Sequence, residues 1–414
     1  MIHCLRKFYF FNFYFNFLSA SFLHYFINFS IINFNINFYL KKSKILVFFN
    51  DGNFFYNRLF FHIDNSKYFI FIEIYIYNDD FLGAVLKNKL FEALKRNVLV
   101  ILIIDYFGSS RIKINFFQDF LYNGGFVFFY NSFFYFFKKI KSFFYRNHRK
   151  VFIFDGIHFY CGGINIGADY ASFSLDFFSR FYDSMILLSG NSVFFFIECF
   201  LKSLLDIYYL YNFFDFFIFY SSYFFFFFNL NNFYYVQTLY SCVKNKLFFL
   251  QDNLLYILNK NSRYCYFIMP YFLPNLKIIN LLINMSLNGS IIRIITSGLS
   301  DIILVKIASQ YIYNFFLKKG IFIYEMCDKL LHSKIILGDG LFTFIGSYNL
   351  NHWSNDKNLE NGANIFNYFF SKKIKKKFYN DLCFVKEISF FFLKNRNKIL
   401  KVFYYLIYNL LIKI

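Results

Sequence analysis

The chain reads HRKVFIFD at residues 148–155 and HSKIILGD at residues 332–339. In both copies six residues separate this segment from a second one, GGIN at 162–165 and GSYN at 346–349. Both copies follow the pattern H-x-K-x4-D-x6-G-[GS]-x-N, and they begin 184 positions apart. Because the chain has only 7 His, composition predicts roughly 0.02 chance matches to H-x-K-x4-D. The doubled pattern therefore indicates two similar halves in one chain.

Size and composition limit the classes of protein to consider. A chain of 414 residues has room for two domains. Its formal net charge of +20 indicates an anionic partner, either nucleic acid or an anionic lipid surface. The 7 Cys are scattered without a C-x-x-C pair, which argues against a zinc site or a disulfide framework and suits a reducing cytoplasm. No stretch has the twenty clean apolar residues of a confident membrane span.

Composition shifts divide the chain into five expected segments. These are an aromatic N-terminal segment (1–43), a first domain (44–205), an aromatic linker (206–240), a second domain (241–371) and a basic, aromatic tail (372–414).

Three of these segments are open to two interpretations each. The N-terminal segment either contacts a membrane or lies outside it, and its Asn residues would be costly in hydrocarbon. Residues 206–236 form either a linker between domains or a loop that dips into a membrane. The tail, with five Lys between 372 and 377, is either a solvated basic helix or an interfacial helix on anionic lipid.

Strand and helix patterns alternate in both halves. Strands are expected at 45–49, 67–77, 98–105, 126–130, 151–154, 180–188, 264–269, 291–296 and 321–325. Helices are expected at 53–66, 82–96, 113–123 and 275–287, followed by one that Ser300 and Asp301 cap and that runs to Lys318. Such alternation predicts an α/β fold in which helices cover a sheet.

The repeated pattern places chemically useful side chains together. Residues i and i+2 of a strand share a face, so His148 projects with Lys150 and His332 projects with Lys334. Two such edges facing each other across a pseudo-twofold would form one site with two imidazoles and two ammonium groups. This suits a phosphodiester, because lysines can hold the charge of the phosphoryl oxygens without a metal or other cofactor. One imidazole would attack phosphorus, while the other would protonate the leaving oxygen and later deprotonate the incoming hydroxyl.

Other residues are candidates for supporting roles. Each imidazole needs an acid on its far nitrogen, and Asp183 and Glu360 follow the two motif asparagines at similar spacing. Asn165 and Asn349 are expected to donate hydrogen bonds to the phosphoryl group. Ser347 is a further phosphate-binding candidate, although the first copy has glycine at the matching position.

Several other polar residues, inside and outside the repeated pattern, have simpler structural interpretations. Asp155 and Asp339 complete the motif and are counted with its catalytic set, but we expect them to brace turns rather than contact substrate. Ser333 is a weak candidate because the first copy has Arg149 there. Glu73 either packs at the edge of the core or forms a wall of the site. The histidines at 62, 158 and 352 have no such context and are expected to be structural.

Together these residues resemble the phospholipase D superfamily, whose signature is the doubled HKD motif. Seven segments look most similar to bacterial cardiolipin synthases, and among those to the B type. They are IIDYFGS (103–109), NHRK (147–150), GGINIG (162–167), RFYD (180–183), PYFLP (270–274), LHSK (331–334) and GSYNL (346–350).

The resemblance implies two phospholipase D-like domains related by a pseudo-twofold, each a mixed β-sheet flanked by helices, with the active site at their interface. It implies that one phosphatidylglycerol transfers its phosphatidyl group to a histidine, with His148 as the nucleophile, and that a second phosphatidylglycerol then attacks to give cardiolipin. Phosphatidylethanolamine is an alternative second lipid. The resemblance also implies a peripheral protein on the cytoplasmic face of a bacterial inner membrane, with no nucleic-acid partner; the oligomeric state stays open.

Two positions depart from the family pattern. Asn351 stands where the family has Asp, and Gly362 stands where it has Asn. Both lie beside the second motif and could weaken it. The alternatives are a phospholipase D-type hydrolase, which shares the same intermediate, and a phosphodiesterase or nuclease. A decayed, non-catalytic membrane protein is a further alternative, but the two intact motifs argue against it.

Overall fold

A computed structural model describes residues 40–112, 114–131, 145–171, 181–208, 234–241, 249–260, 263–391 and 397–413. The segment before residue 40 and most of the expected linker lie outside these ranges. The interpretations placed on those segments therefore stay predictions.

The first half alternates strands with helices. Its strands are β1 (Leu40–Phe49), β2 (Phe69–Ile74), β3 (Leu99–Asp105), β4 (Phe126–Tyr130), β5 (Arg146–Asn147), β6 (Val151–Phe154), β7 (His158–Gly162), β8 (Phe181–Tyr182) and β9 (Met185–Gly190). Its helices are α3 (Gly52–Asn65), α4 (Phe81–Lys95), α5 (Gln118–Tyr122) and α6 (Ser192–Tyr208), with 3-10 turns at Ile114–Phe117 and Ala168–Tyr170.

The second half follows the same plan. Its strands are β10 (Tyr234–Tyr240), β11 (Tyr264–Ile268), β12 (Ile291–Leu299), β13 (Phe322–Leu331), β14 (Ile335–Gly338), β15 (Phe342–Gly346), β16 (Asn358–Leu359), β17 (Asn361–Phe366) and β18 (Val385–Glu387). Its helices are α8 (Phe249–Lys260), α9 (Leu276–Leu287), α10 (Ile303–Leu317), α11 (His352–Asp356), α12 (Tyr368–Leu382) and α14 (Lys398–Lys413).

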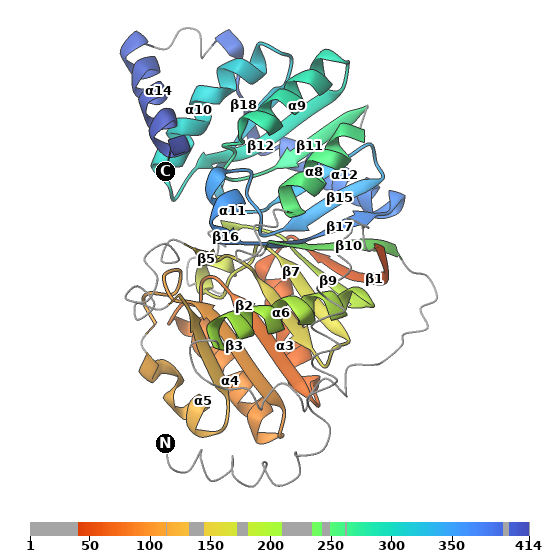
Figure 1. Ribbon diagram of the computed structural model, residues 1–414, viewed down its shortest axis with the longest axis vertical. Helices are drawn as coiled ribbons and strands as arrows, with labels where there is room; N and C mark the ends of the chain where they lie inside the picture. Colours follow the sequence, from red (N-terminus) through yellow and green to blue (C-terminus); the bar gives the residue numbers. More distant parts are fainter. Residues whose placement is uncertain are drawn as a thin grey trace.

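One mixed sheet runs through both halves. Outward from its middle, the first half has the order β1-β9-β7-β6-β2-β3-β4, and the second has β10-β17-β15-β14-β11-β12-β13, with β18 at the edge. In chain order the two halves thus arrange their main strands identically. They meet where β1 and β10 pair antiparallel, with one half above the other (Figure 1). This repeat agrees with the expected pseudo-twofold relation.

The sheet directs both motifs to one edge. Strands β2, β3 and β4 are parallel, as are β11, β12 and β13. The first motif strand, β6, runs antiparallel to β2 with Val151 opposite Glu73, and β14 runs antiparallel to β11 with Ile335 opposite Ile268. The residues that precede β6 and β14 therefore lie at the carboxyl ends of the parallel strands, where open α/β sheets bind ligands.

Local sequence explains several of these elements. The apolar run in β3 is almost fully buried, as expected for a central parallel strand. Asp80 and Asn275 are the N-cap residues of α4 and α9. Their side chains accept hydrogen bonds from the backbone N–H groups three residues later, Gly83 N and Ile278 N. These caps fix where the helices start after β2 and β11.

The core has two faces. On one face, α6 and α12 cover a cluster that spans both halves, with Phe200 of α6 and Phe378 of α12 among its members. On the other face, α3 and α4 cover the first half, while α8, α9 and α10 cover the second. The shared cluster fixes the halves against each other. No helix among the described residues has both the length and the apolar character needed to cross a membrane.

Most expected strands and helices are confirmed, but two expectations are wrong in detail. The strand expected at 180–188 is interrupted, since β8 ends at Tyr182 and β9 begins at Met185, leaving Asp183 between them. Ser300 and Asp301 do not cap α10: its cap residue is Ile302, while Asp301 accepts a hydrogen bond from Tyr271. Helices α6 and α8 lie at positions where no helix was expected.

The expected segment boundaries stay a prediction. Strand β1 already begins at Leu40, and β10 occupies residues 234–240 at the end of the expected linker. Helix α12 runs across the boundary at 372, and both α12 and α14 bear out the helical character expected of the tail.

Candidate active site

Two short parallel pairings bring the halves together around the motifs. Strand β5, which ends just before His148, pairs with β16, which ends just before Glu360. Strand β8, which ends just before Asp183, pairs with the end of β13, one residue before His332. Each motif histidine therefore emerges beside an acid from the other half of the chain.

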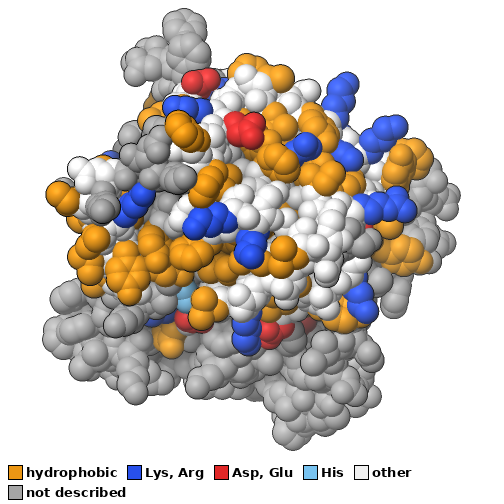
Figure 2. Space-filling view, turned by 90° about the horizontal axis from the view of Figure 1, so that it is seen from above, with side chains coloured by type: hydrophobic (Ala, Val, Ile, Leu, Met, Phe, Trp, Pro, Cys, Tyr) orange, Lys and Arg blue, Asp and Glu red, His pale blue; other side chains and the backbone are white. Residues whose placement is uncertain are grey.

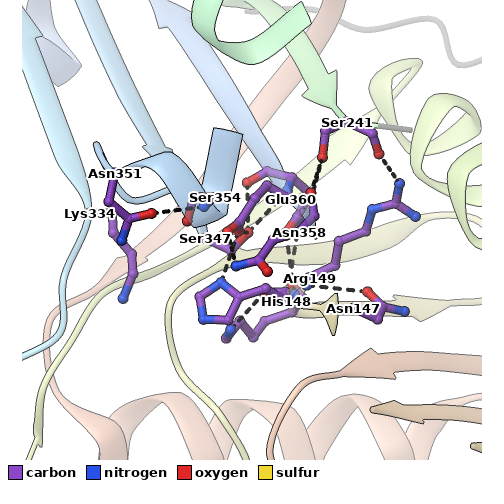
Figure 3. Close-up of polar contacts among 12 residues, drawn as sticks. Asn147, His148, Arg149, Ser241, Lys334, Ser347, Asn351, Ser354, Asn358 and Glu360 are labelled. Atoms are coloured by element: carbon purple, nitrogen blue, oxygen red, sulfur yellow. Dashed lines mark hydrogen bonds and ion pairs between the residues drawn. The ribbon is translucent and has the colours of Figure 1, made fainter. Parts of the chain in front are cut away.

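The first crossed pair joins His148 to Glu360. Nδ1 of His148 lies 2.9 Å from Oε2 of Glu360, and the carboxylate is fully buried. The hydroxyl of Ser347 donates to the same oxygen at 2.5 Å, and Asn358 Nδ2 donates to the other oxygen at 3.3 Å. Figure 3 shows these side chains converging on Glu360. Ser347 thus orients the acid, which is a supporting role, and phosphate binding by Ser347 stays a prediction.

The second crossed pair joins His332 to Asp183. Nδ1 of His332 lies 2.6 Å from Oδ2 of Asp183, and both residues are buried. Gly163 makes room for this carboxylate, because a Cβ there would lie 2.1 Å from Oδ1 of Asp183. Gly163 and Ser347 occupy the same position in the two motif copies. Each therefore lies beside the acid of a crossed pair, and the glycine of the first copy is explained by close packing.

Both lysines are buried beside their histidines. Lys150 Nζ donates to the backbone oxygen of His148 at 2.7 Å and lies 5.0 Å from the centre of the Tyr75 ring. Lys334 Nζ donates in the same way to the backbone oxygen of His332. The two side chains are at most 1% exposed. Two ammonium groups are thus held close to the imidazoles, as the i, i+2 spacing predicted.

Burial and mutual charge set the protonation states. Burial lowers the pKa of His148 to about 4, although Glu360 opposes the shift, and it also lowers the pKa of His332. Burial alone would raise the pKa values of Asp183 and Glu360, but the paired imidazoles and nearby lysines outweigh it and hold both below their ordinary values. At neutral pH each ionised carboxylate can only accept, so each Nδ1 donates. Each Nε2 has no hydrogen-bond partner among the described residues and can act as a base or nucleophile.

Burial makes the charged forms of Lys150 and Lys334 unfavourable. Burial lowers the pKa of Lys150 well below its usual range, and it lowers the pKa of Lys334 to about 8. An anion bound between them would favour the charged ammonium forms. The electrostatics therefore suit an anionic ligand.

Asp155 and Asp339 contact backbone rather than the imidazoles. Asp155 accepts from the backbone N–H groups of residues 67, 68 and 69, and Asp339 accepts from those of residues 263 and 264. Both have positive φ, 51° and 48°. These contacts tie the hairpins after β6 and β14 to the starts of β2 and β11, as expected for residues that brace turns.

The two motif asparagines differ. The amide of Asn165 is used within the first half, accepting from Ile76 N at 3.1 Å and donating to Tyr170 Oη at 2.8 Å. Asn349 is buried, and its Oδ1 has no hydrogen-bond partner among the described residues. Asn349 is thus the better placed of the two to meet a ligand, while Asn165 holds Tyr170 in place.

Aromatic rings around the histidines were not found from the sequence. The Tyr75 ring lies 4.8 Å from that of His148, and the rings of Tyr170 and Tyr271 lie 5.8 and 6.5 Å from that of His332. Tyr271 sits in the segment that holds the only two prolines of the chain, which could have identified it. Tyr75 follows β2 at the ligand-binding edge of the sheet. Its position beside the site could be recognised only after the order of the strands was known.

A buried ion pair behind the first motif was also missed. Arg149 Nη1 lies 3.3 Å from Oε1 of Glu73, which also accepts from Ser203 and from Asn147 Nδ2, both at 2.6 Å. Arg149 Nη2 donates to the backbone oxygen of Ser241 at 2.5 Å, on the side away from His148 (Figure 3). Glu73 therefore packs in the interior and does not form a wall of the site. In the second copy Ser333 replaces the arginine and meets Ser184.

The departures from the family pattern have structural explanations. Asn351 is the cap residue of α11 and accepts from Ser354 N at 2.8 Å, a role that Asp fills equally well. Gly362 packs against the Phe344 ring, where a Cβ would come within 2.3 Å of a ring carbon. Both keep the second motif region folded. Within the described residues, no group of three or more His, Cys, Asp or Glu side chains could hold a metal ion.

Comparisons with known proteins show what this chain is similar to. Residues 254–382 match the family described as "Cardiolipin synthase, PLD-like domain". Cardiolipin synthase 1 of Bacillus cereus is 27% identical over 328 residues, which are 79% of this chain and 64% of that protein. The cardiolipin synthase of Clostridium perfringens is 26% identical over 347 residues, 83% of this chain and 71% of that protein. The chain thus spans less than two thirds of the first of these relatives.

Solved structures show the same fold. A phosphatidylserine synthase of Haemophilus influenzae aligns with a TM-score of 0.65 at 12% identity, over 89% of this chain and 95% of that one. The assignment to the B type stays a prediction. Residues 254–382 thus match the phospholipase D-like domain of the cardiolipin synthase family, and the chain is similar over most of its length to bacterial cardiolipin synthases.

Proposed function

We propose that this chain is a phosphatidyltransferase that makes cardiolipin from two molecules of phosphatidylglycerol. The observation that carries the proposal is the pair of crossed contacts, His148 with Glu360 and His332 with Asp183. Each contact leaves one Nε2 free, and two such imidazoles can share the work of a two-step displacement.

In the first step, Nε2 of one histidine attacks phosphorus, and the bond from phosphorus to the glycerol oxygen breaks. The other histidine, protonated, gives its proton to that oxygen, so that glycerol leaves and a phosphatidyl-histidine remains. In the second step the now neutral second histidine takes a proton from a hydroxyl of another phosphatidylglycerol, whose oxygen attacks phosphorus. Cardiolipin forms and the first histidine is released neutral.

We propose His148 as the nucleophile and His332 as the acid, the roles that the family resemblance implies. The acid must carry a proton when substrate is bound, although burial lowers its pKa. The negative charge of a bound phosphodiester raises an imidazole pKa and offsets that effect. Lys150 and Lys334 would hold the phosphoryl oxygens, and Asn349, whose buried Oδ1 has no partner among the described residues, would turn its amide toward them.

Anionic phospholipid rather than nucleic acid is the proposed substrate. The net charge of +20 suits either, but the relatives that align over most of the chain are cardiolipin synthases. We further propose that the protein acts as a peripheral protein on the cytoplasmic face of a bacterial inner membrane.

A lipid assay tests the proposal. Protein in detergent and phosphatidylglycerol micelles, without added metal, is followed by mass spectrometry, alongside His148→Ala and His332→Ala. Wild type should give cardiolipin and glycerol, and each variant should lose at least about 10³-fold in rate. His158→Ala, a histidine outside the site, is the matched control and should keep its activity.

Other products would change the conclusion. Phosphatidic acid alone would identify a hydrolase that uses water as the acceptor. No product from phosphatidylglycerol, with or without phosphatidylethanolamine, would contradict the lipid assignment and make single-stranded DNA the next substrate to test.

A further inference from the structure

Two equivalent loops, one from each half, expose large apolar side chains beside the candidate site. In the first half, Tyr106 and Phe107 follow β3 and are 42% and 59% exposed. In the second half, Ile302 and Ile303 follow β12, the strand equivalent to β3, and are 46% and 68% exposed. Soluble surfaces do expose single apolar residues, but matched exposure at two related loops indicates a shared purpose.

Each loop is tied to the site by an aspartate. Asp105 accepts from Asn147 N at 2.7 Å, the backbone group immediately before His148. Asp301 accepts from Tyr271 Oη at 2.5 Å, and the Tyr271 ring lies 6.5 Å from that of His332. The exposed apolar side chains therefore lie next to aspartates whose side chains contact groups beside the two histidines.

Helix α14 extends this apolar surface. It packs on α10 through Tyr311, whose ring lies 4.9 Å from that of Tyr408. An ordinary surface helix would turn polar residues outward. Here the outward positions hold Ile399, Phe403 and Leu406, which are 76%, 44% and 58% exposed and follow one another at helical spacing.

Charge favours a lipid over a protein as the occupant of this surface. From Gly298 to Tyr324 the only acidic residue is Asp301, which is paired with Tyr271, and α14 contains no acidic residue at all. Lys398, Lys401 and Lys413 are its charged residues. Figure 2, which looks onto the end where α9, α10 and α14 lie, shows apolar patches interspersed with Lys and Arg and with fewer Asp and Glu. Apolar residues surrounded by cations match an anionic bilayer surface.

We propose that the loop after β3, the loop after β12 and the outer side of α14 form one membrane-docking surface for an anionic bilayer. Docking in this way would hold the two histidines toward lipid headgroups, so that a phosphodiester could enter without leaving the membrane surface. This inference rests on the proposed function, because it assumes that the site takes a phospholipid.

The test uses the whole chain with Ile303→Glu and Leu406→Glu together. The first substitution places an acid in the first turn of α10, where the helix dipole favours it, so the fold should be kept. Both substitutions remove apolar contact and add repulsion. Sedimentation with phosphatidylglycerol-containing vesicles should show wild type bound and the variant weakened at least about tenfold.

A matched control uses Tyr68→Glu with Tyr122→Glu. These residues are 62% and 76% exposed, but they precede β2 and β4 and so lie at the opposite edge of the parallel strands. The control should bind vesicles like wild type. If the Ile303 and Leu406 variant also binds like wild type, or if wild type does not bind anionic vesicles, the docking surface is wrong. Loss of a wild-type dimer in that variant would assign the surface to a second copy and would also overturn the proposal.

A soluble substrate separates this proposal from the proposed function. Short-chain phosphatidylglycerol, kept below its micelle concentration, does not require docking. Retained turnover of this lipid by the variant, together with lost vesicle binding, supports the docking surface. If wild type turns over phosphatidylglycerol neither in micelles nor as the soluble lipid, the proposed function fails, whereas the vesicle comparison still decides whether the surface binds membrane.

Discussion

Asp183 of the first half lies 2.6 Å from Nδ1 of His332 in the second half. Glu360 of the second half makes the equivalent contact with Nδ1 of His148 in the first half. Neither half therefore contains a complete histidine–acid pair of its own. The crossing depends on two short parallel pairings, β5 with β16 and β8 with β13. A site built in this way requires both halves to be docked before either imidazole is oriented.

Asp183→Asn should lower kcat for phosphatidyl transfer by about 10² to 10⁴-fold while leaving the fold intact. The amide can donate to Nδ1 and so favours the wrong tautomer of His332, while its size is unchanged. Steady-state kinetics with phosphatidylglycerol measure the effect. Asp119→Asn, on the exposed helix α5, is the control and should change nothing. Unchanged kcat in Asp183→Asn would mean that His332 does not need this acid.

Lys334→Met should raise thermal stability and abolish activity at the same time. Its ammonium group is buried, and burial lowers its pKa to about 8, so a neutral side chain of similar length removes an electrostatic cost. We expect a Tm increase of about 2–5 °C and a loss of turnover of at least about 10²-fold. Calorimetry and the lipid assay check both. Lys89→Met, which removes an exposed ion pair with Asp64, should alter neither quantity.

Arg149→Met should destabilise the fold by about 3–5 kcal/mol, because it leaves the carboxylate of Glu73 buried without its cation. Urea unfolding measures the difference. Replacing both residues, Glu73→Leu with Arg149→Met, should recover most of the loss because no charge then remains. A double variant as unstable as the single one would show that packing, and not the uncompensated charge, causes the effect.

The free energy of unfolding should fall as the pH decreases from about 6.5 toward about 4. Burial lowers the pKa of His62 to about 4, with His158 and Arg58 adding to the shift, and burial also lowers that of His148 to about 4. Over this pH range the unfolded chain binds more protons than the folded chain does, so a lower pH favours unfolding. Urea titrations at several pH values test this. His62→Phe should make the dependence shallower, and an unchanged slope would remove His62 from the explanation.

How far the sequence predicts this site depends on which residues are considered. The two motif strands, the paired lysines and the two acids could all be predicted, because strand periodicity and spacing are local properties of the chain. The partner of each acid could not, since it depends on β5 and β8 pairing across the halves. The hydrogen bond from Asn165 to Tyr170 and the ion pair of Arg149 with Glu73 both lie within the first half, but they depend on how the side chains pack once the sheet has formed. The ion pair joins residues 76 positions apart.

Tyr182→Phe should lower kcat about tenfold by loosening the segment that carries Asp183. The Tyr182 hydroxyl donates to Asp381 at 2.5 Å and accepts from Lys377 at 2.8 Å, so helix α12 holds this segment from the second half. Its backbone oxygen accepts from His332 N, which places the histidine and its acid on one support. Without the hydroxyl, Lys377 and Asp381 still pair with each other, so the fold should lose only about 1 kcal/mol.

A double-mutant cycle separates this positioning role from a general loss of stability. If Tyr182 acts through Asp183, then Tyr182→Phe should have little further effect on kcat in a chain that already carries Asp183→Asn. Additive effects of the two substitutions would instead show that Tyr182 influences turnover by a route that does not pass through Asp183.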